Sequence, residues 1–502
     1  MATVFAEYAR NRQGWFFGLS GARLVLLVAA GGPILWAVQA DRWSLAGVLC
    51  VAWLVLALLV TVPVRGRSAV GWLVASASLA AGTVFGWTRW RAKAATGQAA
   101  DLETPDLPGV LQGIEIHDGP PQGPSNTRFA LIQDHAQRTW AATAAISHPG
   151  LALADAEERD AQAAGLTELL NACARAGSIS AVQFQIRSVP DDGAEREQWL
   201  ARHEHPHAPQ LSQQVNREIA ANLSQASVRT EAFVSVVVPE SRLARLAREY
   251  GHGVASRGRA MATLVAEVEA LLRTGMRMTS VEWLTSQQLA AAVRTGFAPA
   301  DRAGLVDAAA EQRANPAVNA TVPWAHAGPS GAETVARHYV HDAWCSIAAT
   351  ITLPTRGAVL GALAPVLVPT EPQERRCLLV TFPVVTQAVA DRQSQSAEWS
   401  ADLAEALRAR AGMKTRAKDR AAIGRARELD VKLAWGNALV LPYAVACVTV
   451  PSTMRIAEFG RRLDTSIRRA GYAPLRLDLA QDSAVTAATI PLGVTLDHRT
   501  IQ

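Results

Sequence analysis

The clearest pattern in the chain is a pair of long apolar stretches near the amino terminus. The first covers residues 24–40 and the second residues 44–64, and neither contains a charged residue. A helix of about 20 apolar residues crosses the hydrocarbon core of a bilayer, and about 17 are enough for a short span. A helix can do so because its backbone groups pair within the segment. The pattern therefore predicts a transmembrane helical hairpin.

A third and weaker apolar stretch follows at residues 68–90. It is rich in Ala, Ser and Gly, and Trp alternates with basic residues from Trp87 to Lys93. Such a composition suits a helix that lies in the headgroup layer. Its length would also permit a third span. We favour the interfacial helix, so that residues 1–93 form the membrane anchor as a whole.

Basic residues on both sides of the hairpin predict its orientation. They are Arg10, Arg12 and Arg23 before the first span, and Arg65, Arg67, Arg89, Arg91 and Lys93 after the second. The turn at residues 41–43 has one Asp and one Arg, so its net charge is zero. Basic segments next to membrane spans stay in the cytoplasm. We expect a multi-pass protein of the cell (inner) membrane whose termini and large domain are all cytoplasmic.

Beyond the anchor, strand and helix patterns recur in two runs of similar order. The runs occupy residues 128–313 and 333–502, and segments rich in Pro and Gly at 94–127 and 314–332 are predicted to be linkers. Strands are expected at 129–133, 139–146, 180–189 and 233–238, and then at 335–340, 344–353, 376–385, 439–450 and 475–479. This order predicts an α+β fold in which two similar α+β units with mixed sheets follow the hairpin.

The segment 180–189 alternates most cleanly. Its apolar positions are Val182, Phe184 and Ile186, and its polar positions are Gln183, Gln185 and Arg187. Because successive side chains of a strand point to opposite faces, this pattern predicts a half-buried strand with the polar face in solvent.

Net charge and cysteine content limit the class of protein. The chain of 502 residues has a net charge of +5. The anchor has nine basic and two acidic residues, a net of +7, so the remainder is close to −2. The basic pI therefore does not indicate a nucleic-acid-binding protein. The five cysteines are scattered and form no Cys-x-x-Cys pair, which is typical of buried thiols in a reducing compartment.

One segment of the soluble part is strongly basic. Residues 408–427 contain eight basic residues and only Asp419 as an acid. The basic residues are Arg408, Arg410, Lys414, Arg416, Lys418, Arg420, Arg425 and Arg427. A helix this basic usually meets an acidic partner. We expect it to dock an acidic protein face or anionic lipid, with a solvated helix as the simpler alternative. Direct nucleic-acid binding is not expected, because no aromatic residues are interleaved for base stacking.

Three segments have some features of a chemical site, but each is incomplete. Residues 253–260 have the glycine spacing of a phosphate loop, yet Arg259 and Ala260 replace its lysine and hydroxyl residues. In His203–His207, Pro206 prevents the helical spacing of a zinc site. In the strand pattern of His338–Asp342, the two histidines point to opposite faces. We therefore predict no catalytic residue, no metal ligand and no cofactor.

Several segments together resemble a known type of membrane protein. They are Arg128–Leu131, Met278–Glu282 with Leu289, His338–Asp342, Gln481-Asp482-Ser483-Ala484 and Ile490-Pro491-Leu492-Gly493. The chain is similar, from about residue 14 to 498, to actinobacterial membrane proteins of type IV secretion and conjugation loci. In those proteins a PrgI-like two-helix anchor precedes a region similar to the amino-terminal domain of the conjugation ATPase, without its motor domain. The stretch at 68–88 departs from them, because it is less basic.

This resemblance implies a non-catalytic scaffold subunit in the inner membrane. It implies docking of a separate secretion or conjugation ATPase, contacts with other inner-membrane secretion subunits, and an oligomer within the complex. Among its motifs, Gln481, Asp482, Ser483, Pro491 and Gly493 are the most specific. Two alternatives remain: a subunit similar to EccE of type VII secretion, and a membrane-tethered enzyme with an unrecognised site.

Overall fold

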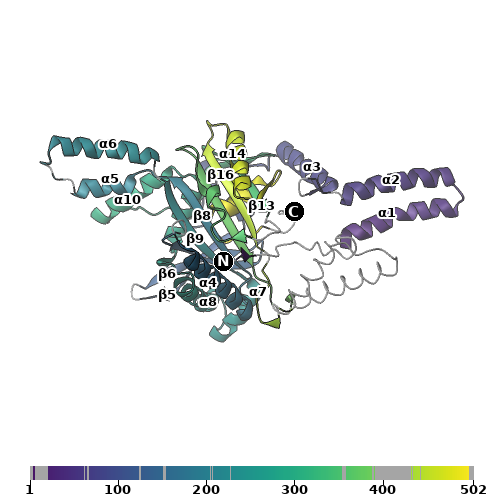
Figure 1. Ribbon diagram of the computed structural model, residues 1–502, viewed down its shortest axis with the longest axis horizontal. Coiled ribbons are helices and arrows are strands. Elements are labelled where there is room, and N and C mark those ends of the chain that lie inside the picture. Colours follow the sequence, from purple (N-terminus) through teal and green to yellow (C-terminus); the bar gives the residue numbers. More distant parts are fainter. Residues whose placement is uncertain are drawn as a thin grey trace.

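The structure of the protein is a computed structural model (Figure 1). It describes residues 4–5, 21–61, 63–64, 67–123, 126–150, 154–203, 205, 207–226, 228–352, 358–386, 389–390, 431, 434–440 and 442–496.

Two antiparallel helices, α1 (Gly21–Gln39) and α2 (Trp43–Thr61), project from the body of the molecule (Figure 1). Trp53 Nε1 donates a hydrogen bond of 2.8 Å to the Leu27 carbonyl oxygen and links the two helices. Over Trp43–Val60, α2 is long and apolar enough to cross a membrane. The apolar parts of α1 and of α3 (Ala69–Phe85) are shorter. Length and composition therefore support one membrane-spanning helix among the described residues, and passage of both helices through a membrane stays a prediction.

A large antiparallel sheet forms the centre of the body. Its strands are β4 (Arg89–Arg91), β5 (Ile114–Gln122), β6 (Thr127–Asp134), β7 (Thr139–Ser147), β8 (Ala181–Pro190), β9 (Val228–Pro239), β10 (Ser280–Trp283), β11 (Gly331–Thr334), β12 (Tyr339–His341), β13 (Trp344–Thr352), β15 (Arg375–Pro383), β16 (Tyr443–Pro451) and β17 (Ala473–Arg476). Two further pairs, β1 (Val4–Phe5) with β14 (Ala358–Val359) and β2 (Pro63–Val64) with β3 (Arg67–Ser68), lie outside it.

The strand order is β4-β11-β12-β13-β16-β15-β8-β9-β7-β6-β5, with β10 beside β7 and β17 beside β13. The α+β class is confirmed, but the expected mixed sheets are wrong, because every described strand pair is antiparallel. The long segment between β8 and β9, which contains α5 (Ala194–His203) and α6 (Gln210–Ala226), brings the chain back to the same end of the sheet at which β8 ends. Neighbouring strands therefore run in opposite directions and need no parallel crossover.

The two halves of the chain have the same strand order and share one sheet. The first half places β7, β9 and β8 side by side with β10 on β7, and the second places β13, β16 and β15 side by side with β17 on β13. Strands β8 and β15 join the halves through a register that runs from Arg376↔Ser188 to Pro383↔Ala181. The sheet is thus continuous across the predicted boundary at 314–332.

Both predicted linkers contain regular structure, which corrects that assignment. Residues 94–127 contain β5, an edge strand whose register shifts between Asp118 and Pro121. Proline is tolerated at a sheet edge or a bulge, so its abundance there does not exclude a strand. Residues 314–332 contain α11 (Trp324–Ala327) and the start of β11. The strand expected at 335–340 is also shifted, because β11 and β12 form a hairpin around Val335–His338.

Helices cover both faces of the sheet. One face packs against α4 (Ala156–Ala176), α7 (Glu240–Ala247), α8 (Val254–Thr274) and α14 (Ile456–Arg469). The other face, here called the clasp face, packs against α9 (Ser286–Phe297), α11, α15 (Gln481–Thr489) and the chain from 490 to 496. Helices α5 (Ala194–His203), α6 (Gln210–Ala226) and α10 (Asp301–Ala314) extend from the body (Figure 1). The short helices are η1 (Ala94–Thr96), η2 (Gly109–Leu111), η3 (Arg248–Tyr250) and η4 (Ala364–Leu367).

The covered clasp face overturns the prediction of a half-buried β8. Gln183, Gln185 and Arg187 lie on this face and are 3%, 3% and 1% exposed. The alternating residues do lie on opposite faces of β8, but the polar side chains contact other parts of the chain instead of water. Alternation reports which residues share a face, and cannot report what covers that face.

Helices α4 and α8 meet at two glycines, and this contact gives a stability test. A Cβ added at Gly165 would lie 2.1 Å from the Gly275 carbonyl oxygen. We expect Gly165→Ala to lower the free energy of unfolding by about 3 kcal/mol, because the backbone must move apart. Gly304→Ala, in α10, is the control: nothing lies within 4 Å of the added Cβ, so the helix should gain up to about 1 kcal/mol. Urea unfolding of both variants measures their free energies of unfolding. Equal values would contradict the close contact between Gly165 and Gly275.

Candidate functional site

The best family-like motif lies in the interior, at the start of α15. Gln481 is fully buried, and its side-chain amide bonds to the backbone of Ala348 in β13. The Ala348 N–H donates to Gln481 Oε1 at 2.7 Å, and Gln481 Nε2 donates to the Ala348 carbonyl oxygen at 3.1 Å. Gln481 therefore acts as an extra strand partner for β13 and fixes α15 on the sheet.

The end of α15 and the chain after it continue this attachment across the seam between the halves, where β8 pairs with β15. Thr143 Oγ1 donates to the Pro491 carbonyl oxygen at 2.9 Å. Gln183 Nε2 and Gln185 Nε2 donate to the carbonyl oxygens of Val494 and Ala488, each at 2.9 Å. We call residues 481–496 the C-terminal clasp, because they bond to strands from both halves.

Gly493 is needed for the path of this clasp. Its φ is +73°, and an added Cβ would lie 2.6 Å from the Ala141 Cβ in β7. Both the backbone conformation and the close approach to the strand favour glycine. The Pro-Leu-Gly part of the motif thus has a structural explanation.

Two buried arginines hold the ends of helices against the clasp face. Arg375 donates to the carbonyl oxygens of Thr295 and Gly296 at 2.7 and 2.6 Å, at the end of α9. Arg187 donates to the carbonyl oxygen of Thr489, the last residue of α15, at 3.3 Å, and to the Ala292 carbonyl oxygen of α9 at 2.9 Å. Its Nε lies 3.2 Å from the Glu231 carboxylate. The last carbonyls of a helix lack partners within the helix and carry partial negative charge. The guanidinium groups supply hydrogen-bond donors to these carbonyls and a positive charge opposite their partial negative charge.

His341, from the predicted His338–Asp342 strand, belongs to a buried polar chain on the clasp face. Its Nε2 lies 2.8 Å from Ser346 Oγ, which lies 2.7 Å from Thr449 Oγ1. Burial and the nearby charge of Arg375 lower the pKa of His341 to about 3. The ring is therefore neutral at physiological pH and acts as a hydrogen-bonding partner in the core.

Other titratable groups near the clasp are also shifted by burial. Cys377 and Cys447 are opposite each other in β15 and β16, and burial raises the pKa of both thiols. Burial likewise raises the pKa of Asp482. A thiol with a raised pKa is a poor nucleophile, because the thiolate is the reactive form. These cysteines are typical of structural thiols.

The remaining predicted segments take different places in the structure. Gly253 precedes α8 and residues 254–260 form the first turns of this helix; the element before them is η3, and not the strand that a phosphate loop follows. Arg257 in this segment lies over the Trp140 ring at 5.3 Å and pairs with Glu240 at 3.3 Å. His203 stacks on Trp199 at the end of α5, with ring centroids 4.4 Å apart. The predicted docking segment, residues 408–427, lies outside the described residues.

Three acidic side chains near α5, those of Asp191, Asp192 and Glu195, lie close enough to share a cation. Arg302 occupies this place: its Nη1 donates to Asp192 Oδ1 at 2.6 Å, and its Nη2 pairs with Glu195. The guanidinium supplies the positive charge that the carboxylates require. The cluster thus ties α10 to the base of α5.

The α5–α6 arm carries an exposed apolar surface that the sequence analysis missed. Leu211, Val215 and Ile219 are 72%, 43% and 42% exposed, and Trp199 on α5 is 56% exposed. The spacing of four residues in α6 places its three apolar residues on one stripe. This spacing was the available signal, but the surrounding Gln, Asn and Ser residues make the segment look uniformly polar.

Comparison with known proteins adds no family assignment. No family model matches the chain, and no curated protein matches it.

We expect Gln481→Ala to destabilise the protein strongly. The substitution leaves the N–H and the carbonyl of Ala348 buried without these partners, and each such group costs about 1–3 kcal/mol. The free energy of unfolding should therefore fall by roughly 2–6 kcal/mol. Ser483→Ala, on the same helix, should change it by less than about 1 kcal/mol. Urea unfolding in detergent measures both variants. Equal stabilities would contradict the proposed role of Gln481 in fixing α15 on the sheet.

The lowered pKa of His341 predicts that part of the folding stability of the protein is lost at acidic pH. Its folded pKa is lowered, so below its ordinary value of 6.5 the unfolded chain binds a proton that the folded chain does not. This contribution to stability is complete above pH 6.5 and is lost as the pH falls toward 3, at about 1.4 kcal/mol per unit. His341→Gln keeps a polar partner for Ser346 without a titrating group. Between pH 7 and about 5, its urea midpoint should fall less than that of the wild type; an identical fall would refute the assignment.

Proposed function

We propose that the protein is a non-catalytic, membrane-anchored scaffold subunit of a type IV, conjugation-like secretion machine that docks a separate ATPase. The observation that carries the proposal is the arrangement of two apolar surfaces on one body. The apolar pair α1–α2 projects at one end, and the α5–α6 arm projects at the opposite end (Figure 1). A sheet shared by both halves of the chain connects them.

The membrane end of this arrangement rests on α2 and the residues around it. The apolar window Trp43–Val60 fits the thickness of a bilayer core. We propose that α1 crosses beside it, so that the basic residues before α1 and after α2 stay in the cytoplasm. The body would then also lie in the cytoplasm, where reduced cysteines are expected.

The distal end offers a surface for another protein. Contiguous exposed apolar residues on a soluble body mark interaction sites, and the stripe of Leu211, Val215 and Ile219 is of this kind. The basic segment 408–427 is the second proposed docking surface, for an acidic face of the ATPase or for anionic lipid. A scaffold role also accounts for the candidate chemical residues, since Gln481 and His341 are used in packing.

Affinity purification of the full-length chain from detergent extracts of its native cells tests the proposal. We expect a conjugation-type ATPase to copurify. A secretion motor with four ATPase domains would instead indicate the EccE-like alternative. Recovery of no ATPase, together with turnover in a substrate screen, would replace the scaffold with an enzyme.

Two variants identify the docking surface in the same experiment. Leu211→Asp with Val215→Asp removes the apolar stripe, and Arg416, Lys418 and Arg420 changed to Glu reverse the basic segment. Loss of the ATPase, by about tenfold or more, should follow one of these changes and not Asn216→Asp, a control on α6. If neither variant reduces copurification, neither surface docks the ATPase.

A further inference from the structure

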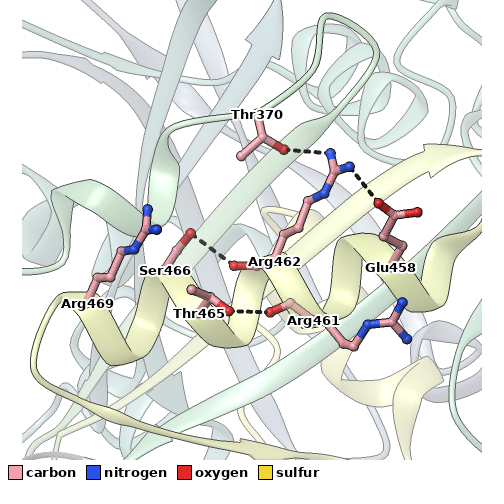
Figure 2. Close-up of a pocket in the computed structure, with 7 residues that line it drawn as sticks. All are labelled: Thr370, Glu458, Arg461, Arg462, Thr465, Ser466 and Arg469. Carbon is pink, nitrogen blue, oxygen red and sulfur yellow. Dashed lines mark hydrogen bonds and ion pairs between the residues drawn. The ribbon is translucent and has the colours of Figure 1, made fainter.

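The outward face of α14 bounds a polar pocket that the scaffold role does not use. Its volume is about 400 Å³. It is lined by Thr370, Glu458, Arg461, Arg462, Thr465, Ser466 and Arg469 (Figure 2). Apart from Thr370, which follows η4, all of these residues belong to α14.

The sequence of α14 sets this arrangement. Phe459, Leu463 and Ile467 recur at intervals of four residues and are buried against the sheet. The intervening positions must then point outward, and they carry the arginine and hydroxyl side chains of the pocket. The loop after η4 faces them and supplies the opposite wall, as Figure 2 shows for Thr370 above Arg462.

Arg462 is fixed in place by several partners. Its Nη2 donates to Glu458 at 2.7 Å and its Nη1 to Thr370 Oγ1 at 3.2 Å, and it also pairs with Glu371. By contrast, Arg461 and Arg469 form no ion pair with any carboxylate of the described residues. The pocket therefore holds positive charge that the part of the chain seen in the structure leaves uncompensated.

A buried guanidinium lies behind the pocket lining. Arg376 is fully buried and pairs with Glu374. Its Nη1 lies 3.4 Å from Ser466 Oγ, a lining hydroxyl, and its Nη2 has no hydrogen-bond partner among the described residues. Arg376 does not itself line the pocket, and its contact with Ser466 fixes one of the lining hydroxyls.

We propose that this pocket binds a phosphate group, with Arg469 and Arg462 as its walls. A phosphate monoester carries close to two negative charges at neutral pH and three strong acceptor oxygens. It can therefore bond with more than one guanidinium, whose planar donors match phosphate geometry. Arg469 is exposed and long enough to fold over a bound anion, while the carboxylates hold Arg462 in position. The open side of the pocket leaves room for the rest of the ligand.

Two sources could present this group: a soluble phosphate monoester or the headgroup of an anionic lipid. Both share the phosphate chemistry that the arginines recognise. The anchor places the body near a membrane if the scaffold proposal holds, but phosphate binding itself does not depend on that proposal. Glycerol 3-phosphate, and micelles of an uncharged detergent with and without phosphatidic acid, distinguish the two sources.

Isothermal titration calorimetry on the full-length chain in an uncharged detergent tests the proposal. Inorganic phosphate should bind to the wild type, and acetate at equal ionic strength should not. Arg469→Gln should weaken phosphate binding by about tenfold or more. Arg468→Gln is the matched control, because Arg468 is exposed on the same helix but does not line the pocket. Its affinity should stay within about twofold of the wild type.

The possible outcomes distinguish a specific phosphate site from non-specific attraction of anions by positive charge. Binding of phosphatidic acid that depends on Arg469 supports a lipid headgroup as the ligand, and binding of glycerol 3-phosphate supports a soluble one. Equal losses in the two glutamine variants would show that general positive charge attracts the anion, and would overturn the proposal. Absence of phosphate binding to a folded wild type would overturn it as well.

Discussion

A sheet that is covered on both faces leaves its polar side chains no access to water, so each one needs a partner inside the protein. In this chain the clasp face carries Thr143, Gln183 and Gln185. Ser235 on β9 lies 2.8 Å from Thr143 Oγ1, but each of the three side chains also has a partner outside the sheet. Their partners are carbonyl oxygens of the C-terminal clasp. The same bonds that satisfy the sheet therefore fix the path of the last described residues, and the covered face and the clasp require each other.

The seam between the two halves depends on the same constraint. Strands β8 and β15 pair along their length, but each brings an arginine, Arg187 or Arg375, to a buried position. A buried charge is tolerated only when it is paired or well hydrogen-bonded. The ends of α9 and α15 meet this need with carbonyls that themselves lack helical partners. Gly296 permits the close approach, since a Cβ there would lie 2.5 Å from Ile490 Cδ1.

Local pattern was sufficient for much of the fold, and the errors share a physical cause. The alternation of residues 180–189 predicted a strand that the structure contains as β8, and the strands expected at 139–146 and 344–353 are present as β7 and β13. The environment of Gln183 was predicted wrongly, because a covering segment some 300 residues away in sequence decides it. The edge strand β5 lies in a segment predicted to be a linker, because its prolines are more typical of loops than of strands. Helix α15 was not predicted either, since it is buried nearly all round and has no polar stripe.

The position of the family-like motif changes what the resemblance can mean. Gln481 and Gly493 are explained by a backbone pairing and a close strand contact, and neither faces solvent. A resemblance based on these two residues therefore indicates a shared way of covering the sheet. It does not by itself indicate a shared partner. Surfaces that meet partners must be sought where side chains lack an internal role. In the described residues these surfaces include the apolar stripe of α6 and the arginines of α14, and the two lie on different elements of the body. Under the proposed scaffold function, a partner protein and a phosphate ligand would then bind at separate surfaces of one continuous sheet.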